Sequence, residues 1–263
     1  LFRSVPPDKE IARFFSDISN GVQVYFEYPN NLDRARAKLR MYKYHMNGLD
    51  PVVDVAIFHP SIEHRLNCGK DNFPTQAYLL GEEGRDVFDF DVVDEFLTKD
   101  GALDRYRVLV YVQGSVTEEF ALRGIQNWVK RGGVLLTCEM GDVETIEGDK
   151  SVWRSLMPAD GETTRRVGKG MVIRTECGPD DRAKLIEAVG RAAYHLSDYS
   201  PNFANAPLID GVADGIKATL LPDRILYYNG TDSAVAKSIT FRPQDWAGRP
   251  KSPPKMEYEL TIA

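Results

Sequence analysis

Short apolar runs alternate with amphipathic stretches between residues 51 and 200, and this alternation constrains the fold more than any other feature of the sequence. The apolar runs are rich in valine, isoleucine and leucine, as the buried strands of parallel sheets are. They are 52–58 ("VVDVAIF"), 88–93 ("FDFDVV"), 106–112 ("YRVLVYV"), 132–138 ("GGVLLTC") and 168–177 ("GKGMVIRTEC"). Strands separated by helices predict an α/β fold, with a parallel sheet and helices on both of its faces.

Two stretches carry the signals of helix ends. The stretch 117–133, "TEEFALRGIQNWVKRGG", has acids in its first turn, bases in its last turn and two glycines at its end. Thr117 is its predicted N-cap residue. Four apolar residues of this stretch fall near one face and predict packing on the sheet: Phe120, Ile125, Trp128 and Val129. A last helix is predicted over 179–196, where a proline and two aspartates stand at the start.

The two ends of the chain follow other patterns. Short alternating runs and turn signals such as Pro222-Asp223 predict a small antiparallel β domain over 204–263. Residues 1–48 hold one strand and one basic helix, which cannot build a core alone. We therefore predict that 1–48 is the terminal βα segment of a TIM barrel that precedes an α/β domain at 49–203. An extra edge strand and helix on that domain is the alternative.

Charge and cysteine content exclude several classes of function. A formal net charge of -6 gives no attraction for nucleic acid or for an anionic membrane, so neither partner is expected. The 3 cysteines are odd in number and lack a CxxC spacing, which argues against a disulfide framework and a structural zinc site. We expect no metal, no cofactor and a cytoplasmic compartment. Because the chain begins at Leu1 and not at methionine, we also expect it to be a piece of a longer protein.

The stretch 131–142, "RGGVLLTCEMGD", predicts a buried strand that runs into a sharp turn, where hydrolases of one large class carry their nucleophile. If Gly141 ends such an elbow, its centre is Glu139, and Cys138 lies one residue early. Side chains alternate between the faces of a strand, so this offset points the thiol into the packing of the sheet. We interpret Cys138, Glu139 and Gly141 as a degenerate nucleophile elbow with a buried structural cysteine.

A nucleophilic cysteine needs a base, and the histidines offer weak candidates. His59, Glu63 and His64 lie close together after the first strand, where α/β sheets bind ligands, but no third metal ligand is evident. We interpret them as solvated loop residues. His195 and Asp198 stand near the end of the last predicted helix, which does not suit the partner pair of a catalytic cysteine.

The strand near the N-terminus carries a third candidate site. Glu27, with Tyr28 and Asn30 beside it, stands where barrel enzymes carry sugar-binding or catalytic groups. Hydrolysis of glycosides ordinarily needs two carboxylates, and this one has no visible partner in the chain. We therefore predict substrate-binding roles for these three residues and no confident catalytic residue.

The order of segments resembles the C-terminal part of family 42 glycoside hydrolases, the β-galactosidase group. Three motifs of that family's class I glutamine amidotransferase-like trimerisation domain have counterparts in the same order: Asp89 to Asp94, Leu103 to Val110, and Trp128 to Thr137. The stretch 19–30 is similar to the last barrel strand of the family, and 223–241 to its small C-terminal β domain. The sequence departs from the family at Glu27-Tyr28-Pro29, where the family has an aromatic and basic sugar-site motif.

The resemblance implies a flavodoxin-like α/β domain that has no catalysis of its own and assembles the protein, as a homotrimer, around the rim of a carbohydrate site. It also implies that the catalytic carboxylates lie upstream of Leu1, so that this segment alone is inert. We therefore expect the C-terminal portion of a glycoside hydrolase. Two alternatives stay open: an active amidotransferase-like or cysteine hydrolase that uses Cys138 with His59 or His195, and a ligand-binding flavodoxin-like module without enzymatic activity.

Overall fold

The computed structural model describes residues 53–66, 75–84 and 88–199, four later strands, and the single residues Phe14, Arg36 and Leu39. The predicted βα segment at 1–48 therefore lies outside the described residues, apart from these three positions. The boundaries at 48/49 and 203/204 stay predictions.

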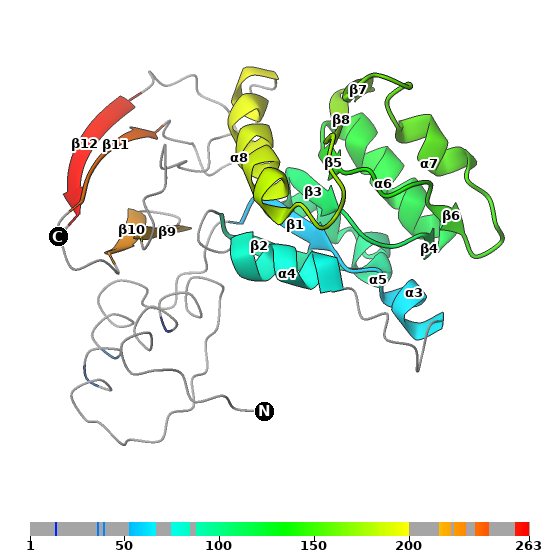
Figure 1. Cartoon of the computed structure of the whole chain (residues 1–263), viewed down its shortest axis with the longest axis horizontal. Coiled ribbons are helices and arrows are strands. Elements are labelled where there is room, and N and C mark those ends of the chain that lie inside the picture. Colours follow the sequence, from blue (N-terminus) through cyan, green and yellow to red (C-terminus); the bar gives the residue numbers. More distant parts are fainter. Residues whose placement is uncertain are drawn as a thin grey trace.

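A six-stranded, mostly parallel sheet forms the centre of the described part (Figure 1). Its strands, in spatial order, are β2 (Phe90–Val93), β1 (Val55–Phe58), β3 (Val108–Tyr111), β5 (Val134–Thr137), β8 (Gly170–Arg174) and β7 (Thr164–Val167). β7 alone among these six strands runs antiparallel to its neighbour. All residues of β1, β3 and β5 are buried, which is why these strands read as continuous apolar runs. The predicted α/β class and parallel sheet are confirmed.

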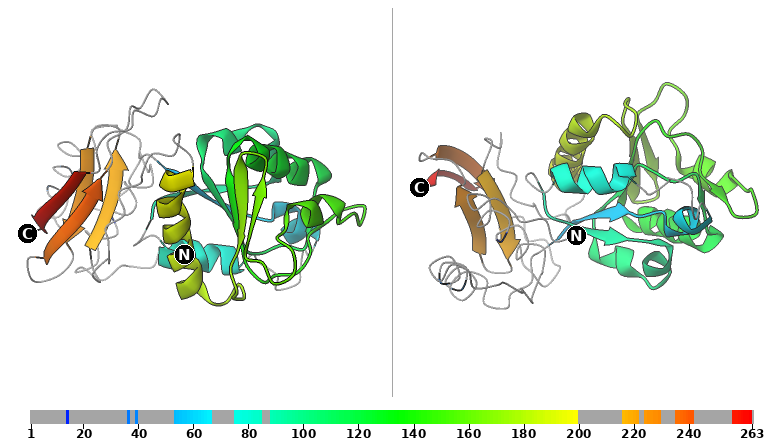
Figure 2. Two further views of the ribbon diagram at one scale, coloured as in Figure 1. Left: turned by 90° about the horizontal axis from the view of Figure 1, so that it is seen from above. Right: turned by 60° about the horizontal axis from the view of Figure 1, so that its bottom comes forward.

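Helices cover both faces of this sheet (Figures 1 and 2). On one face α4 (Thr75–Gly84) and α8 (Arg182–Tyr199) share a buried apolar cluster with alternate residues of β1, β3 and β5. On the other face α6 (Glu119–Arg131) and α7 (Ser151–Leu156) share a second cluster with the remaining residues of these strands. Because strand side chains alternate between the two faces, each strand contributes to both clusters.

The start of α6 differs from the prediction. Thr117 lies in β4 (Val116–Thr117), a two-residue strand that pairs in parallel with β6 (Glu144–Thr145), and Glu118 is the N-cap residue, without a side-chain hydrogen bond. The Thr117 hydroxyl instead donates to Glu95 Oε1 at 3.2 Å, so a tertiary contact takes the group that a local cap would have used. At the other end the predicted stop is confirmed, because Gly132 has a φ of 132° at the C-cap.

The short elements at the carboxyl ends of the strands position the loops of the site. α3 (Ser61–Leu66) follows β1, and α5 (Glu95–Lys99) follows β2, capped by the Asp94 side chain. The 3₁₀ helix η3 (Ala102–Arg105) then leads into β3. β7 and β8 form a hairpin whose turn contains Gly168 at a φ of 64°, so β8 begins at Gly170, two residues after the start of the predicted run.

Four strands follow the α/β part in sequence. β9 (Ile216–Leu221) and β10 (Arg224–Asn229) pair in an antiparallel ladder in which Leu221 lies opposite Arg224. The predicted turn at Pro222-Asp223 lies outside the described residues. β11 (Val235–Phe241) and β12 (Met256–Ile262) form a second antiparallel pair. The α helices of the described part include none that is both long enough and apolar enough to span a membrane.

Candidate functional site

The carboxyl ends of the parallel strands meet at one edge of the sheet, which is where open α/β sheets bind ligands. Two groups of residues occupy this edge. The first lines a pocket after β5, and the second follows β1 and β2.

The pocket after β5 has a volume of about 690 Å³. The loop that follows β5 forms one wall, α7 and the segment after it form the opposite wall, and Arg174 at the end of β8 closes the side. Its lining residues are Cys138, Glu139, Met140, Gly141, Asp142, Trp153, Arg154, Met157, Pro158, Asp160 and Arg174. We call it the β5 pocket.

Cys138 stands at the bottom of this wall and points away from solvent. Its side chain is 3% exposed and belongs to the apolar cluster of α4 and α8, as Leu136 does two residues earlier. Its Sγ lies 3.8 Å from the carbonyl oxygen of Val112, to which the thiol donates. Burial raises the pKa of the Cys138 thiol to about 12, and the neighbouring Cys177 adds to this effect.

The turn after β5 does not have the form of a nucleophile elbow. In an elbow the helix starts directly after the nucleophile, so its first N–H groups help to stabilise the reacting oxygen. Here Gly141, at a φ of 85°, leads instead into β6, and α7 begins only at Ser151. The arrangement at 138–142 supplies no helix N-terminus to the pocket.

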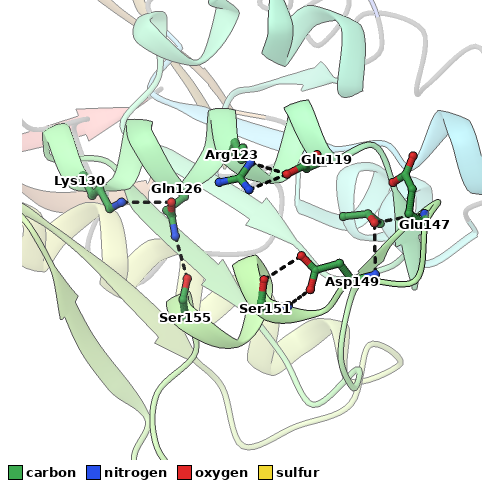
Figure 3. A network of polar contacts seen from close by, with 9 residues as sticks. Glu119, Arg123, Gln126, Lys130, Glu147, Asp149, Ser151 and Ser155 are labelled. Carbon is green, nitrogen blue, oxygen red and sulfur yellow. Dashed lines mark hydrogen bonds and ion pairs between the residues drawn. The ribbon is translucent and has the colours of Figure 1, made fainter.

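A polar network fixes α7, which forms the far wall of the β5 pocket (Figure 3). Gln126 of α6 donates through Nε2 to Ser155 Oγ of α7 at 2.7 Å, and Ser151 at the start of α7 donates to Asp149. Across the pocket mouth Arg154 forms an ion pair with Asp142, and the bonds from Arg154 lower the pKa of that carboxyl group. These contacts tie both walls of the pocket in place.

The residues after β1 and β2 form the second group. The imidazole rings of His59 and His64 lie 6.0 Å apart in an edge arrangement. Burial lowers the pKa of His59, and the nearby His64 lowers it further. Glu63 accepts hydrogen bonds from the backbone N–H groups of Ser115 and Val116. The structure thus brings His59, Glu63 and His64 close together, but the Glu63 carboxylate is already hydrogen-bonded to backbone N–H groups.

Glu95, which the sequence interpretation missed, is the centre of this second group. It is completely buried and accepts from the N–H and the hydroxyl of Ser61, from the N–H of Ile62 at 3.2 Å and from the Thr117 hydroxyl. The sequence feature that could have indicated it is the acidic pair Asp94-Glu95 directly after the second strand. Such a pair is also typical of the first turn of a helix, so the local pattern does not distinguish the two roles. Within the described residues no three His, Cys, Asp or Glu side chains are grouped to hold a metal ion.

The carboxyl ends of β1 and β3, the neighbouring strands at which the strand order reverses, are also covered by side chains of this chain. Gln113 Oε1 accepts from the N–H groups of Gln76 and Ala77 at 2.9 and 3.2 Å, so two N–H groups in the first turn of α4 are paired within the chain. Glu63 and Glu95 likewise pair with N–H groups of the loops beside them, so these described donors are not free to hold a ligand anion.

The remaining predicted residues are not brought to either group by described contacts. Glu27, Tyr28 and Asn30 lie outside the described residues. His195 lies in α8, as predicted, and so does Asp198, because α8 runs three residues beyond the predicted end at 196; their side chains are outside the described part.

We expect Cys138 to react slowly with iodoacetamide in the folded protein. The raised pKa leaves almost no thiolate below pH 10, so the rate should climb up to about pH 12, the pKa that burial imposes. In denaturant the same thiol should react as an ordinary cysteine with a pKa near 9.0. Mass spectrometry of the Cys138 peptide measures both rates, and fast labelling of the folded chain at pH 7 would contradict the burial.

The same pKa shift predicts a loss of stability at alkaline pH. Folding favours the protonated thiol, so its contribution is complete below pH 9.0 and is lost as the pH rises towards about 12. Cys138→Ala removes this contribution, and its free energy of unfolding should therefore fall less steeply over this interval than that of the parent. Urea unfolding at several pH values gives the two slopes.

Comparison with solved structures finds proteins of similar fold. No protein-family model and no curated protein matches the sequence. Among solved structures, the chain is similar to a GH42 β-galactosidase, at 11% identity and a TM-score of 0.54, over 88% of this chain and 41% of that one. A catalytic mutant of a GH42 β-galactosidase from G. stearothermophilus gives 11% identity and a TM-score of 0.53 over the same shares. A cold-adapted β-galactosidase from Rahnella sp. R3 gives 13% identity and a TM-score of 0.49, over 87% of this chain and 43% of that one.

These likenesses, at such low identity, concern the fold. The chain spans less than half the length of the solved structures that it matches.

Proposed function

We propose that this chain is the C-terminal portion of a glycoside hydrolase and that its α/β domain is a non-catalytic module for assembly and for shaping the rim of the active site. One observation carries the proposal: the chain superposes over 88% of its length on a GH42 β-galactosidase, of which it covers 41%. The part that the chain does not cover would hold the catalytic barrel.

The finer assignment, a flavodoxin-like or amidotransferase-like domain, is supported by the order of the strands. Along the sheet the five parallel strands follow the order second, first, third, fourth, fifth in the sequence, which is the flavodoxin-like order. The antiparallel β7 extends this sheet by one strand at its far edge.

A non-catalytic role is supported by the two groups at the sheet edge. A thiol with a pKa of about 12, bonded to a backbone carbonyl, is a poor nucleophile at neutral pH. Glu63 and Glu95 are bonded to backbone N–H groups, which leaves them badly placed to act as general bases. These contacts disfavour the cysteine hydrolase, and the paired donors between β1 and β3 disfavour the ligand-binding module.

Self-association, proposed as a homotrimer, is supported by apolar side chains at the β2 edge of the sheet. Val92 in β2 is 54% exposed, and Phe96 and Leu97 in α5 are 42% and 45% exposed. Large apolar side chains that follow each other at an edge strand and the next helix are typical of an interface.

The test uses the natural protein that contains this chain. We expect it to sediment as a trimer and to hydrolyse one of a panel of p-nitrophenyl glycosides, and we expect the 263-residue chain alone to hydrolyse none of them. Phe96→Glu should dissociate the assembly, because it buries a charge in the interface. Ile146→Glu, at a residue that is 47% exposed near β6, is the matched control. A monomer without glycosidase activity would refute the proposal.

A further inference from the structure

The β5 pocket contains polar groups that nothing in the described fold uses. The side chains of Glu139 and Asp160 both line the pocket, and neither makes a hydrogen bond or ion pair with another described residue. Arg174 bonds through one nitrogen, Nη2, to the carbonyl oxygens of Ala159 and Glu162, which leaves its other N–H groups directed to no described acceptor. The pocket therefore has both acceptors and donors to offer.

The ion pair at the mouth of the pocket leaves further groups free. Arg154 donates through Nε and Nη2 to one oxygen of Asp142, Oδ2. The second carboxylate oxygen of Asp142 and the Nη1 group of Arg154 make no side-chain contact with a described residue. Each member of the pair can therefore still bond to a ligand.

An unpartnered hydroxyl lies beside these groups. Thr137 pairs with Arg174 across the parallel ladder, so the two side chains project from the same face of the sheet. The Thr137 Oγ1 atom is buried and has no hydrogen-bond partner within the described residues. A buried polar atom without a partner is costly, and this one lies next to Arg174, behind the residues that line the pocket.

The balance of charge limits what the pocket can bind. Three carboxylates, from Glu139, Asp142 and Asp160, face two guanidinium groups, from Arg154 and Arg174. An anion would meet the three carboxylates, and a polycation would meet the two guanidinium groups. A neutral ligand with several hydroxyls avoids both conflicts, because each hydroxyl donates to a carboxylate and accepts from a guanidinium. The Met140, Met157 and Pro158 side chains supply apolar walls for its carbon skeleton.

We propose that the β5 pocket is a binding site for a neutral polyhydroxyl ligand of the monosaccharide class, separate from the barrel site of the proposed hydrolase. Its volume, about 690 Å³, falls in the range of roughly 300–1,000 Å³ that is typical of small-molecule sites. The proposal rests on the residues that line this pocket and does not depend on whether the parent protein is a glycoside hydrolase.

The experiment titrates the 263-residue chain with D-galactose and, separately, D-glucose, and follows backbone amide resonances by NMR. We expect one of the sugars to shift the Gly141 and Asp142 amides in a saturable way. Inorganic phosphate and ethylenediamine, as anionic and cationic probes, should leave these amides unchanged. Because the titration tests only the β5 pocket, failure here would leave the hydrolase proposal standing.

Two variants test whether the sugar binds in the β5 pocket. Glu139→Ala and Asp160→Ala should each weaken sugar binding about tenfold, which is the effect of losing one charge-assisted hydrogen bond. Glu82→Ala is the matched control, because Glu82 is an exposed carboxylate on α4 outside the pocket, and it should bind as the parent does. Saturable binding of phosphate or ethylenediamine in place of sugar, no binding of either sugar, or sugar binding that both variants retain would each overturn the proposal.

Discussion

Replacing Gly170 by alanine should destabilise the α/β domain by about 3 kcal/mol or more, at the upper end of what overpacking costs. Gly170 opens β8 where that strand passes the end of α6. A Cβ atom at this position would lie 2.1 Å from the carbonyl oxygen of Val129 and 2.2 Å from that of Gly133. Both oxygens are main-chain atoms that already accept hydrogen bonds, from Gly132 and Met171. Relief of the clash would therefore break a helix end or a strand pair.

The matched control for this change is Gly178→Ala, where an added Cβ atom meets nothing within 4 Å. We expect it to change the free energy of unfolding by less than about 1 kcal/mol. Urea denaturation of the two variants and the parent, with the m-value checked for two-state behaviour, measures the difference. Equal midpoints for the Gly170 and Gly178 variants would contradict the packing of β8 against α6.

Replacing Glu95 by glutamine should cost about 2–3 kcal/mol, the size of a lost set of charged hydrogen bonds in the interior. The carboxylate accepts from Ser61, Ile62 and Thr117, and so joins α5 to α3 and β4. An amide keeps one acceptor oxygen, but it turns an NH₂ group towards donors that need an acceptor. Thermal and urea unfolding of the variant measure the loss.

Glu119→Gln is the control for the charge change. Glu119 forms an i,i+4 ion pair with Arg123 on the exposed side of α6 (Figure 3), and such pairs contribute about 0.5 kcal/mol or less. A cost for Glu95→Gln as small as that for Glu119→Gln would show that the buried carboxylate is not what joins the three elements.

The sequence predicts the parts of the fold that local patterns encode. The strands at 55–58, 108–111 and 134–137 are apolar throughout because both of their faces are covered, and the stop of α6 at Gly132 needs only a glycine at the right place. Thr117 is a residue whose hydrogen-bond partner local patterns did not predict. Its hydroxyl suits a local cap equally well, and its actual partner, Glu95, lies 22 residues away in the sequence.

The β5 pocket could be predicted only in part. The turn at 138–142 gave its position, because the carboxyl ends of parallel strands gather loops at one edge of the sheet. Its other wall comes from α7 and from Arg174, and no periodicity or spacing connects these to Glu139. A site whose residues come from segments far apart in the sequence can be recognised only in the folded structure.

The two edges of the six-stranded sheet are finished differently, and this limits how copies of the protein can meet. At one edge β7 presents Thr164, Arg165 and Arg166 to solvent. Arginines on an edge strand repel an approaching copy of the same strand and so prevent the sheet from growing from molecule to molecule. At the other edge Val92, Phe96 and Leu97 present an apolar surface. In the proposed assembly, with contact at the β2 edge and repulsion at the β7 edge, copies can form a closed ring or a pair but not a continuous ribbon of sheets.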